Sequence, residues 1–127
     1  MVVHCFEAFV TLAATDIKII VEFYTQFLGI EPQPYLPEIY AEFQLPGLKL
    51  GIFKPKSTQV GEFIPEGKTG ISLCLEVPNL EAAIAELSRL GYPPPGEILS
   101  ASHGQEIYAY DPLGNRLILH QSSRQNL

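Results

Sequence analysis

A small set of acidic, basic and nucleophilic side chains falls at strand-like spacing in this sequence. Glu76 and His120 are a carboxylate and an imidazole, which can transfer a proton near neutral pH when they meet. Glu7 offers a further carboxylate. Cys74 could act as a nucleophile if a nearby cation lowered its pKa, or it could be an inert buried thiol. Arg116 could bind a carboxylate through two hydrogen bonds, or it could simply face water.

The first half of the chain predicts a strand, a helix and a hairpin that would position Glu7. Apolar and polar residues alternate over residues 5–13, which is typical of a half-buried strand. Asp16 then offers a helix N-cap, and apolar residues recur at helical spacing until Gly29. Residues 38–45 and 48–54 have strand character and are joined by a Pro-Gly turn, so we expect a hairpin there.

The second half repeats this pattern around Glu76, Arg116 and His120. Residues 71–77 alternate as a strand, Asn79 offers an N-cap, and the following helical pattern ends at Gly91. Three further strands are expected near Ile98, over 105–110 and over 116–121, with a tight turn at 111–115.

The capping residues Asp16 and Asn79 lie about 63 positions apart, which indicates an internal duplication. We therefore predict an α+β fold of two tandem βαβββ modules that form a cleft. In each module the apolar strand face should pack on its own helix and leave the other face available. The predicted boundaries are a single domain over 1–127, with module one at about 5–54, a linker at about 55–69, module two at about 70–121 and a flexible tail at 122–127.

Composition excludes several classes of protein. The chain has 127 residues, of which 46% are hydrophobic and 17% charged, so it can bury a core without disulfides. Its net charge of −6 and scattered basic residues argue against binding to nucleic acid or to an anionic membrane. The sequence has no signal-peptide pattern and no apolar run of membrane-spanning length, and its two cysteines fit no zinc or redox motif, so we expect a cytoplasmic protein.

Three motifs carry a resemblance to a known family. They are Phe23-Tyr24 followed by Leu28-Gly29, Leu90-Gly91 at the end of the second helical pattern, and Asp111-Pro112-Leu113-Gly114-Asn115 before the last strand. Together with the order of elements they resemble the glyoxalase, bleomycin-resistance and dioxygenase group of the vicinal oxygen chelate superfamily. The resemblance implies the two-module fold. It leaves the activity open, because this superfamily includes isomerases, extradiol dioxygenases, fosfomycin-modifying transferases and metal-free drug-binding proteins.

The resemblance also implies where a metal would bind, on the first and last strands of each module. These positions fall on Phe9, Gly51, Ser72 and Ile118. Zinc, iron and manganese prefer imidazole, carboxylate or thiolate donors, and these four side chains supply none of them. We therefore predict no metal and no cofactor.

Strand alternation gives a set of candidates for the face that would line the cleft. They are Glu7, Phe9, Phe53, Ser72, Cys74, Glu76, Arg116 and His120. Phe9 and Phe53 could stack on a planar ligand or could pack in the core. Glu7 and Glu76 could anchor a positive charge, which suits the negative charge of the whole chain.

The sequence thus favours a metal-independent protein of bleomycin-resistance type that binds a small organic molecule, partly aromatic or cationic. Two alternatives stay open. One is a metal-dependent lyase or dioxygenase with an atypical ligand set drawn from Glu7, Glu76 and His120, and the other is a non-catalytic regulatory subunit. We expect a two-fold homodimer, because closed pairing would cover the edges of two incomplete sheets.

Overall fold

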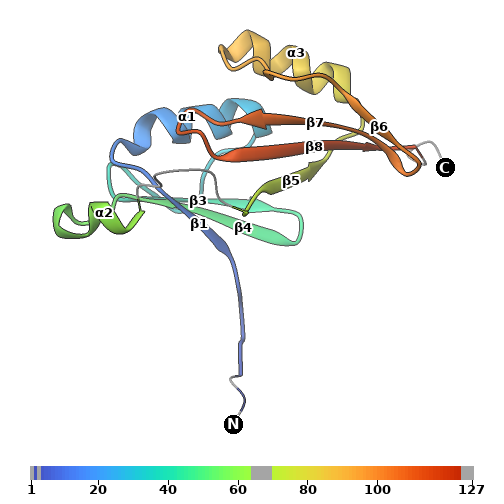
Figure 1. Ribbon diagram of the computed structural model, residues 1–127. Helices are drawn as coiled ribbons and strands as arrows, with labels where there is room; N and C mark the ends of the chain where they lie inside the picture. The colour runs from blue at the N-terminus through green and yellow to red at the C-terminus, as the bar shows by residue number, and fades with distance from the viewer. Residues whose placement is uncertain (1, 3, 64–69, 124–127) are drawn as a thin grey trace. The chain divides into compact units, whose positions relative to one another are not determined.

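The computed structural model describes residues 2, 4–63 and 70–123 (Figure 1). The chain divides into two compact units, Met1–Glu66 and Gly67–Leu127. Each unit contains one four-stranded sheet, and in each the order along the chain is a strand, a helix and three strands. The predicted α+β fold of two tandem βαβββ modules is therefore confirmed.

Module one contains β1 (Val10–Ala13), α1 (Ile17–Leu28), β2 (Tyr35–Leu36), β3 (Tyr40–Leu45) and β4 (Leu48–Phe53). The strand order in its sheet is β1-β4-β3-β2. Strand β1 runs parallel to β4, and the other neighbours are antiparallel. A 3₁₀ turn (Ser57–Gln59) and the short helix α2 (Val60–Phe63) follow, within the segment that we predicted as a linker. The rest of that segment, 64–69, lies outside the described residues.

Module two contains β5 (Leu73–Glu76), α3 (Leu80–Leu90), β6 (Leu99–Ala101), β7 (Gly104–Tyr110) and β8 (Arg116–Ser122). Its strand order is β5-β8-β7-β6, again with one parallel pair, β5 and β8. Strand β8 extends to Ser122, one residue further than the sequence predicted, and 124–127 lie outside the described residues.

Both long helices begin and end at the predicted residues. The side chains of Asp16 and Asn79 accept hydrogen bonds from backbone amides in the first turns of α1 and α3. Gly29 and Gly91 follow the last turns in the left-handed conformation, which glycine adopts without strain. Among the described residues, no helix has both the length and the apolar character needed to cross a membrane.

Each helix covers one face of its own sheet. In module one, Ile20 and Tyr24 of α1 are fully buried, as are Leu50 and Ile52 of β4. In module two, α3 packs along the sheet (Figure 1) and the buried Leu117 and Leu119 of β8 face it. The hydrophobic effect therefore fixes which way every strand residue points. We call the other side of each sheet its helix-free face.

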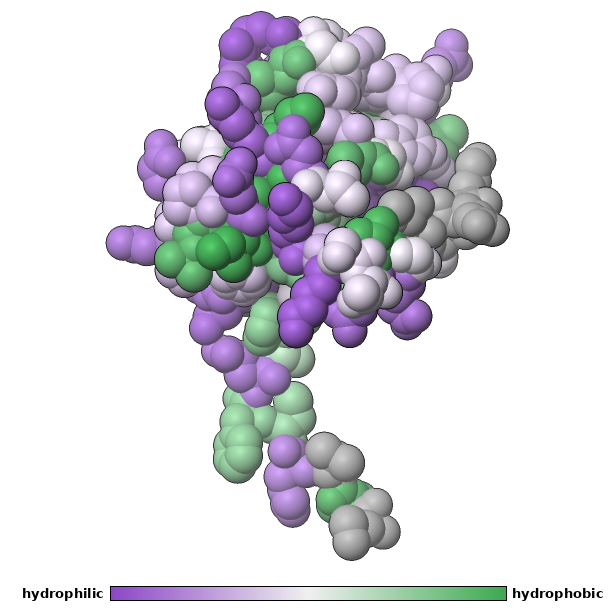
Figure 2. All heavy atoms as spheres, turned by 90° about the vertical axis from the view of Figure 1, so that its left-hand side faces the viewer, coloured by the Kyte–Doolittle hydropathy of each residue, from purple (hydrophilic) through white to green (hydrophobic). Residues whose placement is uncertain are grey.

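The first strand is shorter than the sequence predicted. Parallel pairing sets Val10 opposite Leu50, and β4 begins only two residues earlier, at Leu48. Residues 4–7 therefore have no partner on β4, and the segment that they form runs out from the sheet (Figures 1 and 2). The alternation over residues 5–13 places Phe6 on the apolar face that we expected to pack on the helix, but this expectation is wrong because its side chain is 100% exposed.

The turn between β7 and β8 depends on Asp111, which is buried. Its carboxylate accepts hydrogen bonds from the backbone amides of Leu113 and Asn115, both at 2.9 Å, and from the Asn115 side chain at 2.8 Å. We predict that Asp111→Ala lowers the free energy of unfolding by about 1–3 kcal/mol, because three part-buried donors lose their acceptor. Urea denaturation measures the change. Glu97→Ala removes an equal charge from an exposed loop and should change stability little; equal losses in both variants would contradict this role of Asp111.

Candidate functional site

The structure brings Glu76 and His120 together on the helix-free face of module two. The two residues lie opposite each other on β5 and β8. Oε1 of Glu76 is 2.7 Å from Nδ1 of His120, and Oε2 of Glu76 accepts a hydrogen bond of 2.7 Å from the backbone amide of Ser122. Both carboxylate oxygens are therefore engaged, which fixes the orientation of the imidazole ring.

Two residues that the sequence analysis did not select complete this group. Glu106 lies opposite His120 on β7, and His103 lies in the turn between β6 and β7. The rings of His103 and His120 are stacked, with centroids 5.0 Å apart and an interplanar angle of 15°. One ligand atom from each of His103, Glu106 and His120 lies within 4.8 Å of the other two. The antiparallel pairing of β7 and β8 could have indicated Glu106 once its register was known, whereas His103 lies outside this ladder.

The remaining candidates of module two lie on the same face or beside it. Nη1 of Arg116 donates a hydrogen bond of 3.0 Å to Oγ of Ser72. Cys74 lies opposite Ile118, two positions along the ladder before the Glu76–His120 pair and on the same face of the sheet. Its thiol is free and exposed, so the interpretation as a buried thiol is wrong.

Glu7, Phe9 and Phe53 belong to module one. Oε2 of Glu7 and Nζ of Lys49 form an ion pair of 2.7 Å, and this hydrogen bond raises the pKa of Lys49. Phe9 precedes β1 and is exposed, whereas Phe53 packs edge-to-face on Phe63 with ring centroids 5.0 Å apart. A cleft shared by the two modules stays a prediction.

A hydrogen-bonded group missed by the sequence analysis lies at the centre of the helix-free face of module one. Tyr40 donates to Oε1 of Glu42 at 2.8 Å, and Gln44 donates to Oε2 at 2.6 Å. These bonds hold the pKa of Glu42 below its ordinary value, so the carboxylate stays ionised at neutral pH. Burial, together with the hydrogen bond and charge of Glu42, raises the pKa of Tyr40 to about 12.

Tyr40 covers Gly51, which is one of the positions where the resemblance implies a metal ligand. A Cβ atom at position 51 would lie 2.7 Å from the Tyr40 hydroxyl and 3.3 Å from the Thr11 side chain. The space that a ligating glutamate would need is thus occupied by the tyrosine.

The four positions implied by the resemblance do not fit a metal ion. Gly51 has no side chain, Ile118 is apolar, Phe9 is an exposed aromatic, and Ser72 accepts a hydrogen bond from Arg116. None of them offers an imidazole, carboxylate or thiolate. We therefore derive no reaction step through a metal at these positions.

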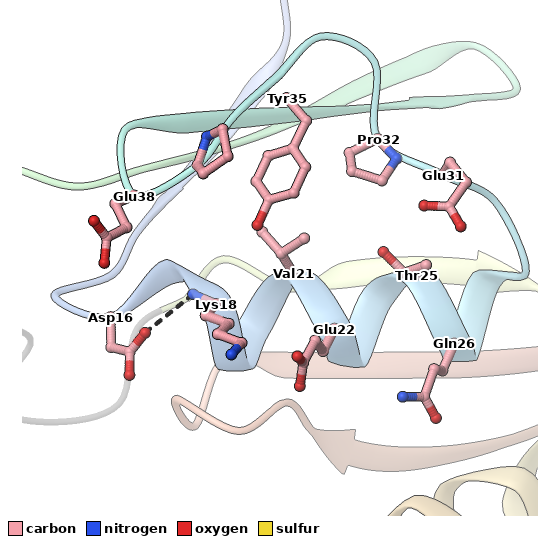
Figure 3. A pocket seen from close by; sticks show the side chains of 11 residues that line it. Asp16, Lys18, Val21, Glu22, Thr25, Gln26, Glu31, Pro32, Tyr35 and Glu38 are labelled. Atoms are coloured by element: carbon pink, nitrogen blue, oxygen red, sulfur yellow. Dashed lines mark hydrogen bonds between the residues drawn. The ribbon is translucent and has the colours of Figure 1, made fainter.

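A separate pocket of about 630 Å³ lies on the helix side of module one, between α1 and residues 31–38 (Figure 3). Figure 3 shows the ring of Tyr35 pointing from this segment toward Val21 of α1. Four of the residues that line the pocket are acidic, namely Asp16, Glu22, Glu31 and Glu38. None of the predicted cleft residues lines it.

The paired βαβββ modules, each with one helix on one face of a mixed four-stranded sheet, define a glyoxalase/bleomycin-resistance-like fold. Comparison with solved structures shows the same class. A glyoxalase-related enzyme from Fulvimarina pelagi matches with a TM-score of 0.74 and 18% identity, over 93% of this chain and 89% of that chain.

Two further structures of this class also cover nearly the whole chain. A glyoxalase/bleomycin resistance protein from Catenulispora acidiphila matches with a TM-score of 0.64 and 23% identity, over 92% of this chain and 98% of that one. The fosfomycin resistance protein FosX from Mesorhizobium loti matches with a TM-score of 0.69 and 11% identity, over 94% of both chains. No protein-family model and no curated protein matches the sequence. At these identities the likeness shows the fold alone.

The arrangement around Tyr40 makes a prediction about pH. The folded-state pKa of about 12 exceeds the ordinary value of 10.0, so the folded protein holds this proton more tightly than the unfolded chain. The stability due to this difference is complete below pH 10 and is lost as the pH rises toward 12. We expect the stability difference between the wild type and Tyr40→Phe to be constant from neutral pH to pH 10 and to shrink above it.

Spectrophotometric titration supplies the second readout, because six tyrosines are present and only the ionisation near pH 12 should vanish in Tyr40→Phe. Tyr108→Phe is the matched control, since Tyr108 is 42% exposed. A wild-type titration without an ionisation near pH 12 would contradict the environment described for Tyr40.

Proposed function

We propose that this chain is a small-molecule-binding protein that holds an aromatic or cationic organic ligand without the help of a metal. The observation that supports it is the composition of the helix-free face of module one. There an ionised carboxylate, Glu42, accepts a hydrogen bond from Tyr40, which covers Gly51, and Phe53 lies opposite Tyr40 on the neighbouring strand.

The carboxylate is suited to bind a positive charge. Glu42 has a lowered pKa and accepts hydrogen bonds from neutral donors, Tyr40 and Gln44, so its charge is oriented but not cancelled by them. The nearest cation described for this face, Lys49, is paired with Glu7. The net charge of −6 further favours a cationic ligand by attracting it from solution.

The aromatic residues supply the apolar part of a binding surface. Phe53 is half-buried and lies directly opposite Tyr40 across the β3–β4 ladder. An aromatic ring near an ionised carboxylate can hold a quaternary ammonium group through its π face while the carboxylate attracts the charge. Metal independence rests on the donor chemistry at positions 9, 51, 72 and 118, which suits no metal.

Calorimetric titration with benzyltrimethylammonium, in the presence of EDTA, tests this proposal. We expect saturable binding that EDTA does not change, and weaker or no binding of benzoate. Glu42→Gln should lower the affinity for the cation about tenfold or more, because a hydrogen-bonded charge contributes about 1.5–3 kcal/mol. Phe53→Leu should weaken it by a smaller factor.

Glu22→Gln is the matched control, since it removes the same charge from the pocket on the helix side. It should leave the affinity unchanged. Loss of binding in Glu22→Gln rather than Glu42→Gln would move the ligand to the pocket, and the absence of binding by any organic cation would reject the proposal.

The proposal includes a homodimer. Strand β1 is an edge strand of its sheet, and edge strands offer unpaired backbone groups to a partner. The segment that leads into β1 carries the exposed aromatic side chains of Phe6 and Phe9. We expect light scattering to give twice the chain mass, and Phe6→Ser to shift the protein toward monomer. A wild-type protein that is monomeric at micromolar concentration would contradict this part.

A further inference from the structure

We propose that module two binds a divalent transition-metal ion through His103, Glu106 and His120. These residues differ from the positions 9, 51, 72 and 118 where the resemblance implies a metal. The proposed ion and the organic ligand proposed above belong to different modules and are independent of each other.

Strand pairing brings the three donors together. Glu106 and His120 are direct partners across the β7–β8 ladder, so their side chains leave the same face of the sheet side by side. His103 approaches from the turn before β7. The three ligand atoms lie within 4.8 Å of one another. Zinc bonds of about 2.0–2.2 Å place ligand atoms at most about 4 Å apart, so the nearly parallel rings of His103 and His120 must rotate about their side-chain bonds for all three residues to bind one ion.

His120 has one nitrogen that nothing described in the structure satisfies. Its Nδ1 is engaged by Glu76, while its Nε2 is buried and has no hydrogen-bond partner among the described residues. A buried polar nitrogen without a partner is unfavourable, and a bound water or ion can satisfy such a group. A lone pair on Nε2 is what a metal ion requires.

Glu76 contacts the ring nitrogen of His120 that does not face the proposed ion. A metal-binding histidine usually donates its other N–H to a carboxylate, which fixes the tautomer and makes the imidazole a better ligand. Oε1 of Glu76 lies 2.7 Å from Nδ1 of His120, and the Ser122 amide holds the other carboxylate oxygen at 2.7 Å. Glu76 is thus a positioning residue for His120.

The turn that carries His103 is built for close approach to β8. Gly104 has a φ of +147°, and a Cβ atom there would lie 2.2 Å from the carbonyl oxygen of Gln121 and 3.1 Å from the His120 ring. Only glycine fits at this position. The amide of Ser123 donates to the carbonyl of His103 at 3.2 Å, which fastens the turn to the end of β8. The stacked position of His103 over His120 follows from this backbone contact.

The donor set selects the type of metal. Two imidazoles and one carboxylate suit zinc, iron(II), cobalt(II) or nickel(II), whereas magnesium and calcium prefer oxygen ligands only. The carboxylates of Glu76 and Glu106 together offset the charge of a divalent ion. His103 is exposed and Glu106 is half-buried, which leaves coordination positions open to water.

Titration of the untagged, metal-free chain of 127 residues with Co²⁺ alone tests the site, because bound cobalt(II) gives a visible spectrum that reports its ligands. Calorimetric titration with Zn²⁺ gives the affinity. We expect one ion per chain and a rise in melting temperature on loading. The affinity for Zn²⁺ should fall on the order of 100-fold in each of the variants His103→Gln, Glu106→Gln and His120→Gln. Each substitution should also change or abolish the cobalt spectrum.

The chain offers a matched control, because its one remaining histidine, His4, belongs to the other compact unit, Met1–Glu66. His4→Gln should bind Zn²⁺ like the wild type. Glu76→Gln should weaken Zn²⁺ by about 10–100-fold while the ion stays bound, as expected for a residue that orients a ligand. Circular dichroism checks that each variant is folded. Because His103 is exposed, we expect His103→Gln to disturb the fold least among these variants.

A wild-type protein without saturable cobalt or zinc binding would overturn this inference, as would folded His103→Gln and Glu106→Gln variants with unchanged affinity. Loading with Zn²⁺ should leave the affinity for benzyltrimethylammonium unchanged. The two proposals can therefore fail separately, because Glu42→Gln should affect only the organic cation and Glu106→Gln only the metal.

Discussion

The burial of one face of each sheet under its own helix is the constraint on which the rest of the structure depends. Leu50 and Ile52 in module one, and Leu117 and Leu119 in module two, are fully buried. Strand side chains alternate with a period of two. The burial of these four residues on the helix side therefore determines which face of the sheet the neighbouring side chains point to. The polar and ionisable side chains of the central strands therefore lie on the helix-free faces.

Strand pairing then converts this alternation into rows that cross the sheet. In module two, Glu76, His120 and Glu106 form one row over β5, β8 and β7, although they are far apart in the sequence. Each hydrogen bond in the row restrains the next side chain, because the Ser122 amide holds Glu76 and Glu76 holds His120. The backbone ladder, rather than any local motif, is what creates a group of metal-ligand type.

The sequence predicted the elements well because their signals are local. Asp16 and Asn79 cap the helices, Gly29 and Gly91 end them, and the turn around Asp111 has the hydrogen bonds that its motif indicates. The site was predicted less well because it depends on pairing between distant strands. Glu76 and His120 could be placed on one face by alternation, but choosing Glu106 required the β7–β8 register. His103 required the close approach that Gly104 permits, which no local pattern encodes.

The two modules show how a duplicated backbone acquires two kinds of surface. The row that holds Glu76, His120 and Glu106 in module two corresponds, by its register, to Ala13, Phe53 and Tyr40 in module one. The backbone pairing is the same in both rows, so the difference lies entirely in the side chains. Carboxylates and imidazoles can hold a metal ion, whereas a methyl group and two aromatic rings can only pack, stack or donate a phenolic hydrogen bond. One module is thus suited to metal ligation and the other to an organic molecule, and neither role needs the positions where the resemblance implies a metal.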